Sequence, residues 1–443
     1  MLKALLAAAS AALFVSVGAA AAEPAVVYRN ATLIDGTGAA PRPGTSILVR
    51  GERIERIWKE GEAAFKLAPD TQVVDMTGKF ALPGLTDSHE HLATPPNRRF
   101  AKAQMRRDLY SGITQVRDMA DDMRNIADLS RATRIGELPG PDIYYAALMA
   151  GPSFFEDPRV QAASLGAKGG EVSWMQAIGP DTDMGLAVAQ ARGIGASAIK
   201  IYANLPGEQV ARITAEAHRQ GMPVWAHAAV FPATPGQVLA AGVDSVSHVC
   251  MLAYEASDQV PSQYHHRAAV QEERFGKGVN PKVAPLLEAM KANGVILDAT
   301  VRIYAEMQGH PRSYCSLDLA ARLTGQALKA GVTISAGTDG FSAPGAAFPA
   351  LYEELELLVD RAGFTPMQAI VAATRNGALA VRKDPDFGTV EPGKLANLIF
   401  TTQDPSRDIR ALRTLTLTVK RGKPFPRANF DPAADFSARN LEP

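Results

Sequence analysis

Short apolar runs alternate with helix-length stretches through most of this chain of 443 residues, and this alternation limits the folds available to it. The runs lie at residues 80–82, 113–116, 142–146, 198–201, 223–226, 245–247, 295–297 and 332–335. Helical patterns such as 207–220 and 316–330 separate several of them. Strands that alternate with helices are typical of a parallel sheet with crossover connections. Eight such units predict a closed (β/α)8 barrel of the TIM type, with a doubly wound open sheet as the alternative.

The two ends of the chain carry a different, strand-rich pattern. Strand patterns separated by turn signals lie at 26–28, 31–34 and 46–49, and similar patterns return at 396–400 and 415–419. We therefore expect the two ends to pair into a small β-sandwich domain. This divides the chain into a β-sandwich at 23–80 plus 385–430 and a metal-dependent barrel at 81–384.

Residues 1–22 have the pattern of a secretory signal peptide. Lys3 supplies a positive charge, residues 4–21 are apolar, and three alanines at 20–22 precede Glu23. An uncleaved membrane anchor is the alternative, although the segment is short and alanine-rich for a span. We therefore expect an exported protein, periplasmic in a Gram-negative cell, with no stable membrane span after the signal is removed.

Charge and cysteine content narrow the function classes further. The 46 basic and 46 acidic side chains cancel to a formal net charge of zero, and no long basic run suggests a nucleic-acid partner. Cys250 and Cys315 are the only cysteines. An oxidising compartment would permit a bridge between them, but two thiols do not make a disulfide framework, and we expect two small, buried, unpaired residues.

The distribution of histidine is the main functional signal. Of only eight histidines, His89, His227 and His248 lie at or just past the carboxyl end of a predicted strand. His91 follows His89 by two residues, and residues two apart in an extended segment project to the same side. Two imidazoles on one side can bind one ion. Taken alone, the pair is a weak signal, since two surface histidines or two histidines with satisfied hydrogen bonds explain it more readily than a metal site.

Lys200 interrupts the apolar run at 198–201. Burying an ammonium group without a partner is costly, so we expect the pKa of this amine to be lowered. A neutral buried amine can act as a Schiff-base nucleophile, or can take up carbon dioxide to become a carboxylate-like carbamate between two cations. Extension of the side chain to solvent, or an ion pair with a carboxylate, is the alternative.

Asp339 follows the last apolar run. A carboxylate there can bind a metal and accept a proton from water, although a turn or a helix cap would use the same residue. Asp339 is one of five metal-competent groups that each lie at the end of a predicted strand. Catalysis in such barrels takes place at the face where the strands end, so one site explains these residues better than five accidents.

These residues stand in segments that resemble the amidohydrolase superfamily. Besides Lys200, the matching segments are 83–91 (PGLTDSHEH), 225–228 (WAHA), 247–249 (SHV), 336–339 (AGTD) and 388–397 (GTVEPGKLAN). The similarity covers nearly the whole chain after residue 22, and is greatest to imidazolonepropionase-like proteins and to prolidase-type (Xaa-Pro) dipeptidases. Imidazolonepropionase proper uses one metal and lacks the strand-four lysine, so Lys200 indicates the binuclear, peptidase-like branch.

The resemblance implies a role for each matching residue. His89 and His91 would hold the more buried metal together with Asp339. His227 and His248 would hold the more exposed metal. Carbamylated Lys200 would bridge the two. Zinc is the default ion, and manganese or cobalt would fit the same ligands.

The expected reaction is hydrolysis of an amide bond in a dipeptide or an N-acyl amino acid by a metal-bridging hydroxide, with Asp339 moving a proton from the hydroxide to the leaving nitrogen. A cyclic amide or lactone hydrolase or a deaminase on the same barrel is the first alternative. A non-catalytic barrel scaffold and a Schiff-base lyase that uses Lys200 are alternatives from other classes.

Substrate contacts are less defined by the sequence. Tyr202 lies two residues after Lys200 on the same side of its strand and could bind a carbonyl or carboxylate, or could be a core tyrosine. Arg117 could bind an anionic group, although a structural ion pair with Asp118 fits its position better. The insertion at 151–180 could form an apolar wall or a lid, and the loop histidines at 265–266 and 310 could cover the site. We expect a small-molecule amide or peptide substrate and, by the resemblance, a homo-oligomer.

Overall fold

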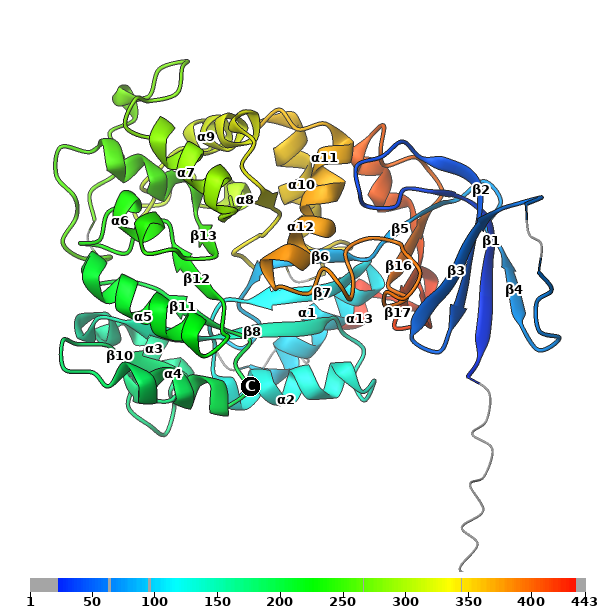
Figure 1. Cartoon of the computed structure of the whole chain (residues 1–443), viewed down its shortest axis with the longest axis horizontal. Helices are drawn as coiled ribbons and strands as arrows, with labels where there is room; N and C mark the ends of the chain where they lie inside the picture. The colour runs from blue at the N-terminus through cyan, green and yellow to red at the C-terminus, as the bar shows by residue number, and fades with distance from the viewer. Residues whose placement is uncertain (1–22, 63–64, 95–96, 266, 344, 436–443) are drawn as a thin grey trace, which may run out of the picture.

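The computed structural model describes residues 23–62, 65–94, 97–265, 267–343 and 345–435. The predicted signal peptide therefore lies outside the described residues. The described chain consists of a barrel and a separate domain built from both ends of the chain, which lies on the right in Figure 1. Within the described residues, no helix combines the length and the apolar character that crossing a membrane requires.

The end domain is one mixed sheet of eight strands. Its strands are β1 (Ala25–Leu33), β2 (Arg42–Arg50), β3 (Arg53–Lys59), β4 (Gln72–Asp75), β5 (Phe80–Pro83), β16 (Leu398–Thr401), β17 (Leu415–Lys420) and β18 (Lys423–Pro426). The two ends of the chain meet where β5 pairs antiparallel with β16, which places Pro83 opposite Leu398. Inside this domain the rings of Tyr28 and Phe400 lie 5.0 Å apart. The expected pairing of the two ends is confirmed.

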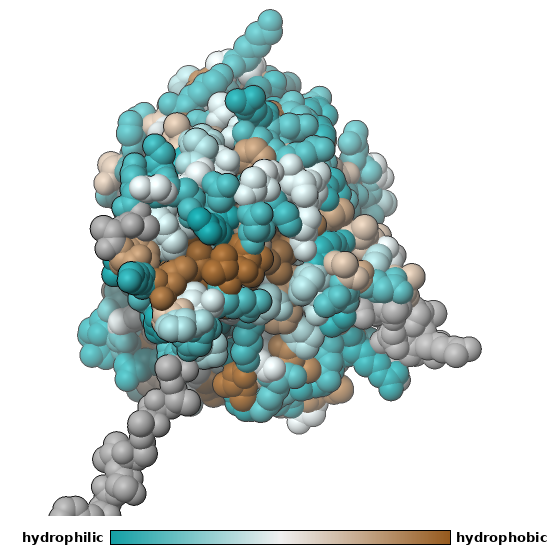
Figure 2. All heavy atoms as spheres, turned by 90° about the vertical axis from the view of Figure 1, so that its right-hand side faces the viewer, coloured by the Kyte–Doolittle hydropathy of each residue, from teal (hydrophilic) through white to brown (hydrophobic). Residues whose placement is uncertain are grey.

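On the outer side of the end domain, hydrophobic residues form a band surrounded by hydrophilic residues (Figure 2).

The end domain is held to the barrel by a buried ion pair. The carboxylate of Asp142, the first residue of the third barrel strand, lies 2.8 Å from the Lys420 ammonium and 2.8 Å from the Arg421 guanidinium. Two cations on one buried carboxylate hold β17 against the barrel, since removing either partner of such a pair leaves an uncompensated charge.

The barrel contains eight parallel strands, the number predicted, and seven of them coincide with predicted strands. The eight strands are β6 (Leu85–Glu90), β7 (Ile113–Asp118), β8 (Asp142–Ala150), β11 (Ala198–Ile201), β12 (Val224–His227), β13 (Ser245–Ser247), β14 (Ile296–Asp298) and β15 (Ile334–Ser335). Each strand pairs parallel with the next along this series. The backbone N–H of Ser88 donates to the carbonyl of Ala336 over 2.8 Å, and this bond joins the first strand to the segment after the last.

One predicted barrel strand was wrong. Residues 80–82 belong to β5, in the end domain, and the first barrel strand is β6. The two strands follow each other so closely in the sequence that they read as one apolar run. They are separated only by Gly84, where a Cβ atom would overlap Oγ1 of Thr114. The chain therefore passes from one domain to the other at a glycine, and His89 lies inside a barrel strand rather than beyond it.

Helices cover the outside of the barrel (Figure 1). The longer ones are α1 (Arg98–Tyr110), α2 (Met123–Arg134), α4 (Met184–Gly193), α5 (Gly207–Arg219), α7 (Ala284–Asn293), α9 (Leu317–Ala330) and α10 (Leu351–Asp360), and the shorter ones are α6 (Pro235–Ala240), α8 (Val301–Glu306), α11 (Pro366–Ala372), α12 (Arg375–Ala380) and α13 (Pro432–Asp435). The 3-10 helices of this part of the chain are η2 (Val249–Ala256), η3 (Glu272–Arg274), η4 (Ile409–Thr414) and η5 (Arg427–Asn429). The two predicted helices are confirmed as α5 and α9.

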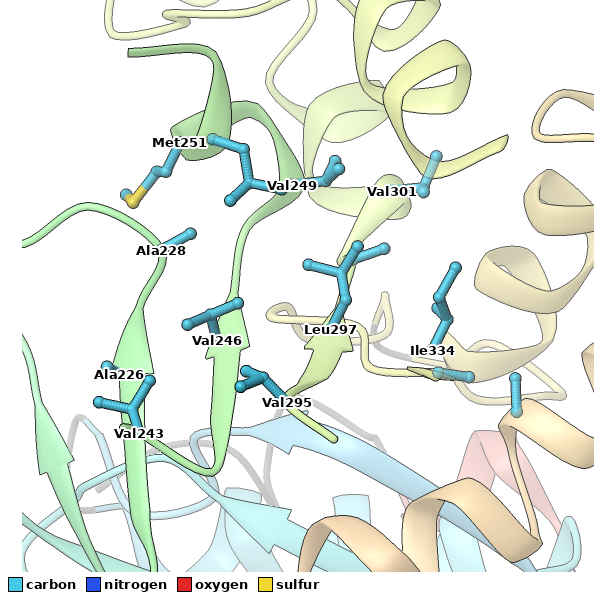
Figure 3. Close-up of a cluster of buried hydrophobic side chains, with 14 of the residues drawn as sticks. Ala226, Ala228, Val243, Val246, Val249, Met251, Val295, Leu297, Val301 and Ile334 are labelled. Atoms are coloured by element: carbon cyan, nitrogen blue, oxygen red, sulfur yellow. The ribbon is translucent and has the colours of Figure 1, made fainter. Parts of the chain in front are cut away.

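Side chains alternate between the two sides of each barrel strand. Ala226, Val246, Leu297 and Ile334, from four neighbouring strands, lie beside one another in the apolar layer (Figure 3). Their sequence neighbours His227, Ser247, Asp298 and Ser335 face the opposite way. This alternation carries polar and charged side chains into the barrel interior, where a site can be built.

The insertion after β8 forms a small unit of its own. It contains η1 (Pro152–Glu156), α3 (Pro158–Ala163), β9 (Glu171–Val172) and β10 (Met175–Ala177). Strand β10 pairs parallel with the end of β8. A separate apolar cluster packs this unit against β8; it includes Leu148, Phe154, Val160, Ala163 and Met175.

The two cysteines are bonded to each other. Cys250 in η2 and Cys315, two residues before α9, form a disulfide across a sequence separation of 65 residues. Both are buried, as expected, but the expectation of unpaired thiols was wrong. The disulfide forms because the loops that carry the two cysteines follow adjacent strands, β13 and β14. The spacing of the two cysteines in the sequence does not predict this bond.

Candidate metal centre

Four histidines and Asp339 converge where the barrel strands end. His89 lies in β6, and His91 follows its last residue. His227 ends β12, and His248 follows β13 directly. One ligand atom each from His89, His248 and Asp339 lies within 4.8 Å of the others, a spacing that one metal ion could bridge.

Asp339 is at the middle of this group. Its Oδ1 lies 3.4 Å from Nε2 of His89 and 3.6 Å from Nε2 of His91. Its Oδ2 lies 3.7 Å from Nδ1 of His248. The ring of His227 lies 4.8 Å from that of His248. The predicted histidines and the predicted carboxylate are therefore brought together in one cluster.

Two of these residues have strained backbones. His248 has φ 70° and Asp339 has φ 48°. Both values lie in the left-handed region, which residues with a Cβ atom rarely adopt. Such strain costs on the order of 1–3 kcal/mol per residue and persists only when the surrounding structure enforces it. Both residues lie in the turns that carry the chain off a barrel strand, so the turn geometry directs their side chains into the cluster.

Three outer side chains hold the histidine rings in place. Nδ1 of His89 lies 2.6 Å from Oδ2 of Asp298, and Nδ1 of His91 lies 3.3 Å from Oδ1 of Asp121. Nδ1 of His248 lies 3.0 Å from the Thr300 hydroxyl. Contacts of this kind are typical of metal-binding histidines, because they fix the tautomer and the ring orientation.

These three residues were not among those predicted from the sequence. Asp298 carries a signal that could have identified it, since it ends the seventh strand just as His227 ends the fifth. Asp121 and Thr300 lie in loops, and nothing in their sequence surroundings distinguishes them from other loop residues.

Lys200 lies in the barrel interior as predicted. Its side chain is fully buried, and its amine has no hydrogen-bond partner among the described residues. Burial, with a smaller effect from the nearby Arg117 guanidinium, lowers the pKa of the Lys200 amine to about 7. Nδ1 of His227 is likewise buried without a hydrogen-bond partner in the described chain. These two buried nitrogen atoms fit a metal centre, since each would otherwise carry the full desolvation penalty.

Burial also sets the charge of the other groups. It holds the pKa values of His89, His227 and His248 well below the usual range, so these imidazoles are neutral and can act as ligands. Burial has the largest single effect on His91 and opposes its protonation, but the hydrogen bond to Asp121 and the negative charges of Asp121 and Asp339 together outweigh burial and raise the pKa of His91. Burial raises the pKa of the Asp339 carboxyl to about 6.

A cavity of about 1000 Å³ opens onto the cluster, and His89, His91, His227, His248 and Asp339 line it. Tyr202 lines the same cavity, with its ring 4.1 Å from that of His227. The insertion after β8 contributes Phe154 to the wall. The loop residue His265 also lines the cavity, His310 is exposed, and residue 266 lies outside the described chain.

Arg117 is placed differently. Its side chain is fully buried, and its guanidinium donates to the Ser88 carbonyl, the Ser245 hydroxyl and Oδ2 of Asp298. It does not belong to the lining of the cavity. The structural ion pair expected for Arg117 is therefore present, but its partner is Asp298 rather than Asp118.

Comparisons with known proteins agree with this geometry. A sequence model of the amidohydrolase family matches residues 80–425. The ochratoxinase of Aspergillus niger is 26% identical over 470 residues, which cover 95% of this chain and 90% of that protein. The crystal structure of A. niger ochratoxinase aligns with a TM-score of 0.72 at 22% identity, over 93% of this chain and 98% of that one. A Xaa-Pro dipeptidase with bound methionine aligns with a TM-score of 0.70 at 22% identity, over 91% of this chain and 100% of that one.

Proposed function

Since this chain belongs to the amidohydrolase family and is a hydrolase of carbon–nitrogen bonds, we propose that it cleaves the amide bond of a dipeptide or an N-acyl amino acid with two bound divalent metals. The observation that carries the proposal is the fully buried Lys200, whose amine has no hydrogen-bond partner in the described chain. One metal held by His89, His91 and Asp339 alone would leave this amine without a role.

Each ligand has an assigned place in the proposal. His89, His91 and Asp339 would hold one metal, and His227 and His248 would hold the other. The Lys200 amine would add to carbon dioxide and release a proton, and the resulting carbamate would supply oxygen ligands for the two metals. Zinc suits a set rich in imidazole, and manganese or cobalt would accept the same ligands. When bound, the metals supply Lewis acidity, which makes water more acidic and polarises a carbonyl.

The side chains of this protein then complete the hydrolysis. Asp339 accepts a proton from the attacking water, whose oxygen forms a bond to the carbonyl carbon. Asp339 delivers that proton to the nitrogen as the carbon–nitrogen bond breaks, so that the products are a carboxylic acid and an amine. Burial raises the pKa of the Tyr202 hydroxyl well above its usual value, so Tyr202 stays protonated and can donate a hydrogen bond to the substrate.

The names of the similar proteins support an amide substrate over the alternatives. Ochratoxinase and a Xaa-Pro dipeptidase are among them. A cyclic amide or lactone hydrolase, or a deaminase, would use the same ligand types, and a non-catalytic scaffold would have no need of all six.

The test combines metal analysis with a substrate panel. Purified protein, reconstituted with zinc, manganese or cobalt, is assayed against dipeptides, N-acyl amino acids, aryl amides, lactones and aminopurines. We expect close to two metals per chain and turnover of dipeptides or N-acyl amino acids. Fewer than one metal per chain, with no hydrolysis of any class, would overturn the proposal. Turnover of lactones or aminopurines alone would favour the alternative hydrolase or deaminase.

The carbamate has its own test. Protein equilibrated with 13C-labelled bicarbonate should give one carbamate signal in the 13C spectrum. Lys200→Ala should lose that signal together with metal and activity, whereas Lys168→Ala, at an exposed lysine, should keep all three. A wild-type metal content in Lys200→Ala would contradict the bridging role.

We also propose that the protein is exported. The signal pattern at residues 1–22 and the Cys250–Cys315 disulfide both suit an oxidising compartment. Amino-terminal sequencing of protein from the periplasmic fraction should begin at Glu23. Recovery of the full chain from the cytoplasm would contradict export.

A further inference from the structure

Arg267 places a cation on the wall of the cavity. Its guanidinium carbon lies 4.3 Å from the centre of the Tyr264 ring and 4.1 Å from the centre of the Tyr314 ring. One of its nitrogens donates to the Tyr264 carbonyl over 2.9 Å. Its Nε is buried and has no hydrogen-bond partner among the described residues, and no described carboxylate forms an ion pair with Arg267.

The other two arginines of the cavity differ from it. Arg159 forms an ion pair with Asp157, with a shortest distance of 2.6 Å. Arg312 is exposed, so water can solvate its charge. Arg267 thus combines partial burial, a position between two rings and an Nε that has no hydrogen-bond partner in the described chain.

That combination points to an anionic ligand. A guanidinium cannot lose its proton in a protein, so burial leaves it charged and in need of acceptors. The two tyrosine rings offset part of this cost through cation–π contacts, but they do not satisfy the N–H donors in the guanidinium plane, and Nε has no hydrogen-bond partner in the described chain. A carboxylate matches the planar donor fork of a guanidinium and forms two parallel hydrogen bonds with it.

The position of Arg267 relates this anion to the reaction. The Tyr264 ring, which packs on Arg267, also stacks on His227 with ring centres 5.4 Å apart and an interplanar angle of 25°. One aromatic ring therefore separates Arg267 from a proposed metal ligand. In an N-acyl amino acid, the α-carboxylate is attached to the carbon next to the scissile nitrogen. A carboxylate bound by Arg267 would place that amide beside His227.

The remaining wall defines the rest of the substrate. Leu148, Val160, Ala163 and Met175 form an apolar recess on the side of the insertion. The cavity volume of about 1000 Å³ lies at the upper end of the range for sites that bury drug-sized ligands, roughly 300–1000 Å³. A dipeptide of two small residues would leave much of this space unfilled.

We propose that Arg267 binds the α-carboxylate of the substrate and thereby selects N-acyl amino acids with a bulky apolar group over neutral amides. The proposal rests on the amide hydrolysis proposed above. It makes Arg267 a specificity-determining residue whose contact with the substrate is separate from the metal ligands.

The test uses N-benzoyl-L-phenylalanine and its neutral counterpart N-benzoyl-L-phenylalaninamide, with benzoate release followed by chromatography. Wild-type kcat/KM should be about 100-fold higher for the acid, because only the acid has a carboxylate that can form a charge pair with Arg267. Arg267→Met should raise KM for the acid about 100-fold with little change in kcat, and should leave the neutral amide unaffected. Arg267→Lys keeps the charge without the planar fork and should recover part of the loss.

A matched variant separates this contact from the general positive charge of the cavity. Arg312→Met removes an equal charge at an exposed position, and its preference for the acid should stay within about twofold of wild type. Equal loss of preference in Arg312→Met and Arg267→Met, or no preference in the wild type, would overturn the assignment of Arg267.

Binding measurements give a second readout that does not require turnover. By calorimetry, metal-loaded wild-type protein should bind 3-phenylpropanoate about 100-fold more tightly than 3-phenylpropanamide, and Arg267→Met should remove the difference. If metal-loaded protein hydrolyses no N-acyl amino acid but retains this difference, the proposed function fails and the anion site stands. If hydrolysis occurs without any difference between acid and amide, the proposed function stands and the anion site fails.

Discussion

Nδ1 of His89 lies 2.6 Å from Oδ2 of Asp298, and both side chains are almost completely buried. The same carboxylate oxygen accepts hydrogen bonds from Arg117 and from the Ser247 hydroxyl. Asp298 therefore joins three barrel strands to one histidine ring. The orientation of His89 depends on a residue that is 209 positions away in the sequence.

Asp298→Asn should weaken metal binding. An amide cannot supply the negative charge that orients His89 and makes it more basic, and loss of such an outer contact typically lowers metal affinity about 10–100-fold. Competition with a metal chelator measures the change. Asp258→Asn, at an exposed residue paired with Arg274, serves as the control and should keep wild-type affinity. Equal affinities in Asp298→Asn and the wild type would mean that His89 needs no support from this carboxylate.

Asp339→Asn should separate metal binding from turnover. The amide oxygen can still reach a metal, but it cannot accept and return a proton at neutral pH. We expect metal content close to that of the wild type and a fall in kcat of about 100-fold or more. Metal analysis and steady-state kinetics on one preparation test this. A variant that turned over at the wild-type rate would remove Asp339 from proton transfer.

Glu354→Gln should change how stability depends on pH. The Glu354 carboxyl accepts hydrogen bonds from the backbone N–H groups of Val301 and Arg302, but burial dominates and raises its pKa from 4.5 to about 8. The folded state therefore holds this proton more tightly than the unfolded state. Its contribution to stability is complete below pH 4.5 and is lost as the pH rises through about 8.

Between these limits the wild type should lose stability relative to Glu354→Gln by about 1.4 kcal/mol per pH unit. Glutamine keeps one oxygen acceptor, so the lost hydrogen bond adds a constant offset that does not alter the slope. Urea unfolding at several pH values from 5 to 8 measures it, with the exposed Glu288→Gln as a control for net charge. Parallel pH profiles for the wild type and Glu354→Gln would contradict the prediction.

Cys250→Ser should destabilise the oxidised protein. The disulfide closes a loop across 65 residues, and in the chain-entropy account a loop of this length contributes about 4 kcal/mol. Chemical unfolding with and without dithiothreitol measures this contribution. The wild type and Cys250→Ser should differ under oxidising conditions and converge under reducing ones. Two titratable thiols in the oxidised wild-type protein would show that the bond is absent.

The sequence determined the barrel and which histidines and carboxylate meet where its strands end. Strand–helix alternation is a local property, because side-chain periodicity follows from the backbone geometry of each segment. Parallel strands of a barrel also end at one face, so residues at the strand ends, such as His227 and His248, could be grouped without knowing any contact between them. The pairing of the two chain ends followed from the same kind of local pattern.

Only the tertiary structure decided which residues support that cluster and shape its cavity. Two of these contacts join segments that are far apart in the sequence: the hydrogen bond between Asp298 and His89, and the Cys250–Cys315 disulfide. The third, Arg267 between the rings of Tyr264 and Tyr314, lies in loops without regular periodicity. Arg117 shows the same limit, since its choice of Asp298 over the adjacent Asp118 depends on where two strands meet in the barrel interior. Local periodicity fixes which way a side chain points along its own strand, whereas its partner depends on packing between segments, and that packing exists only once the chain has folded.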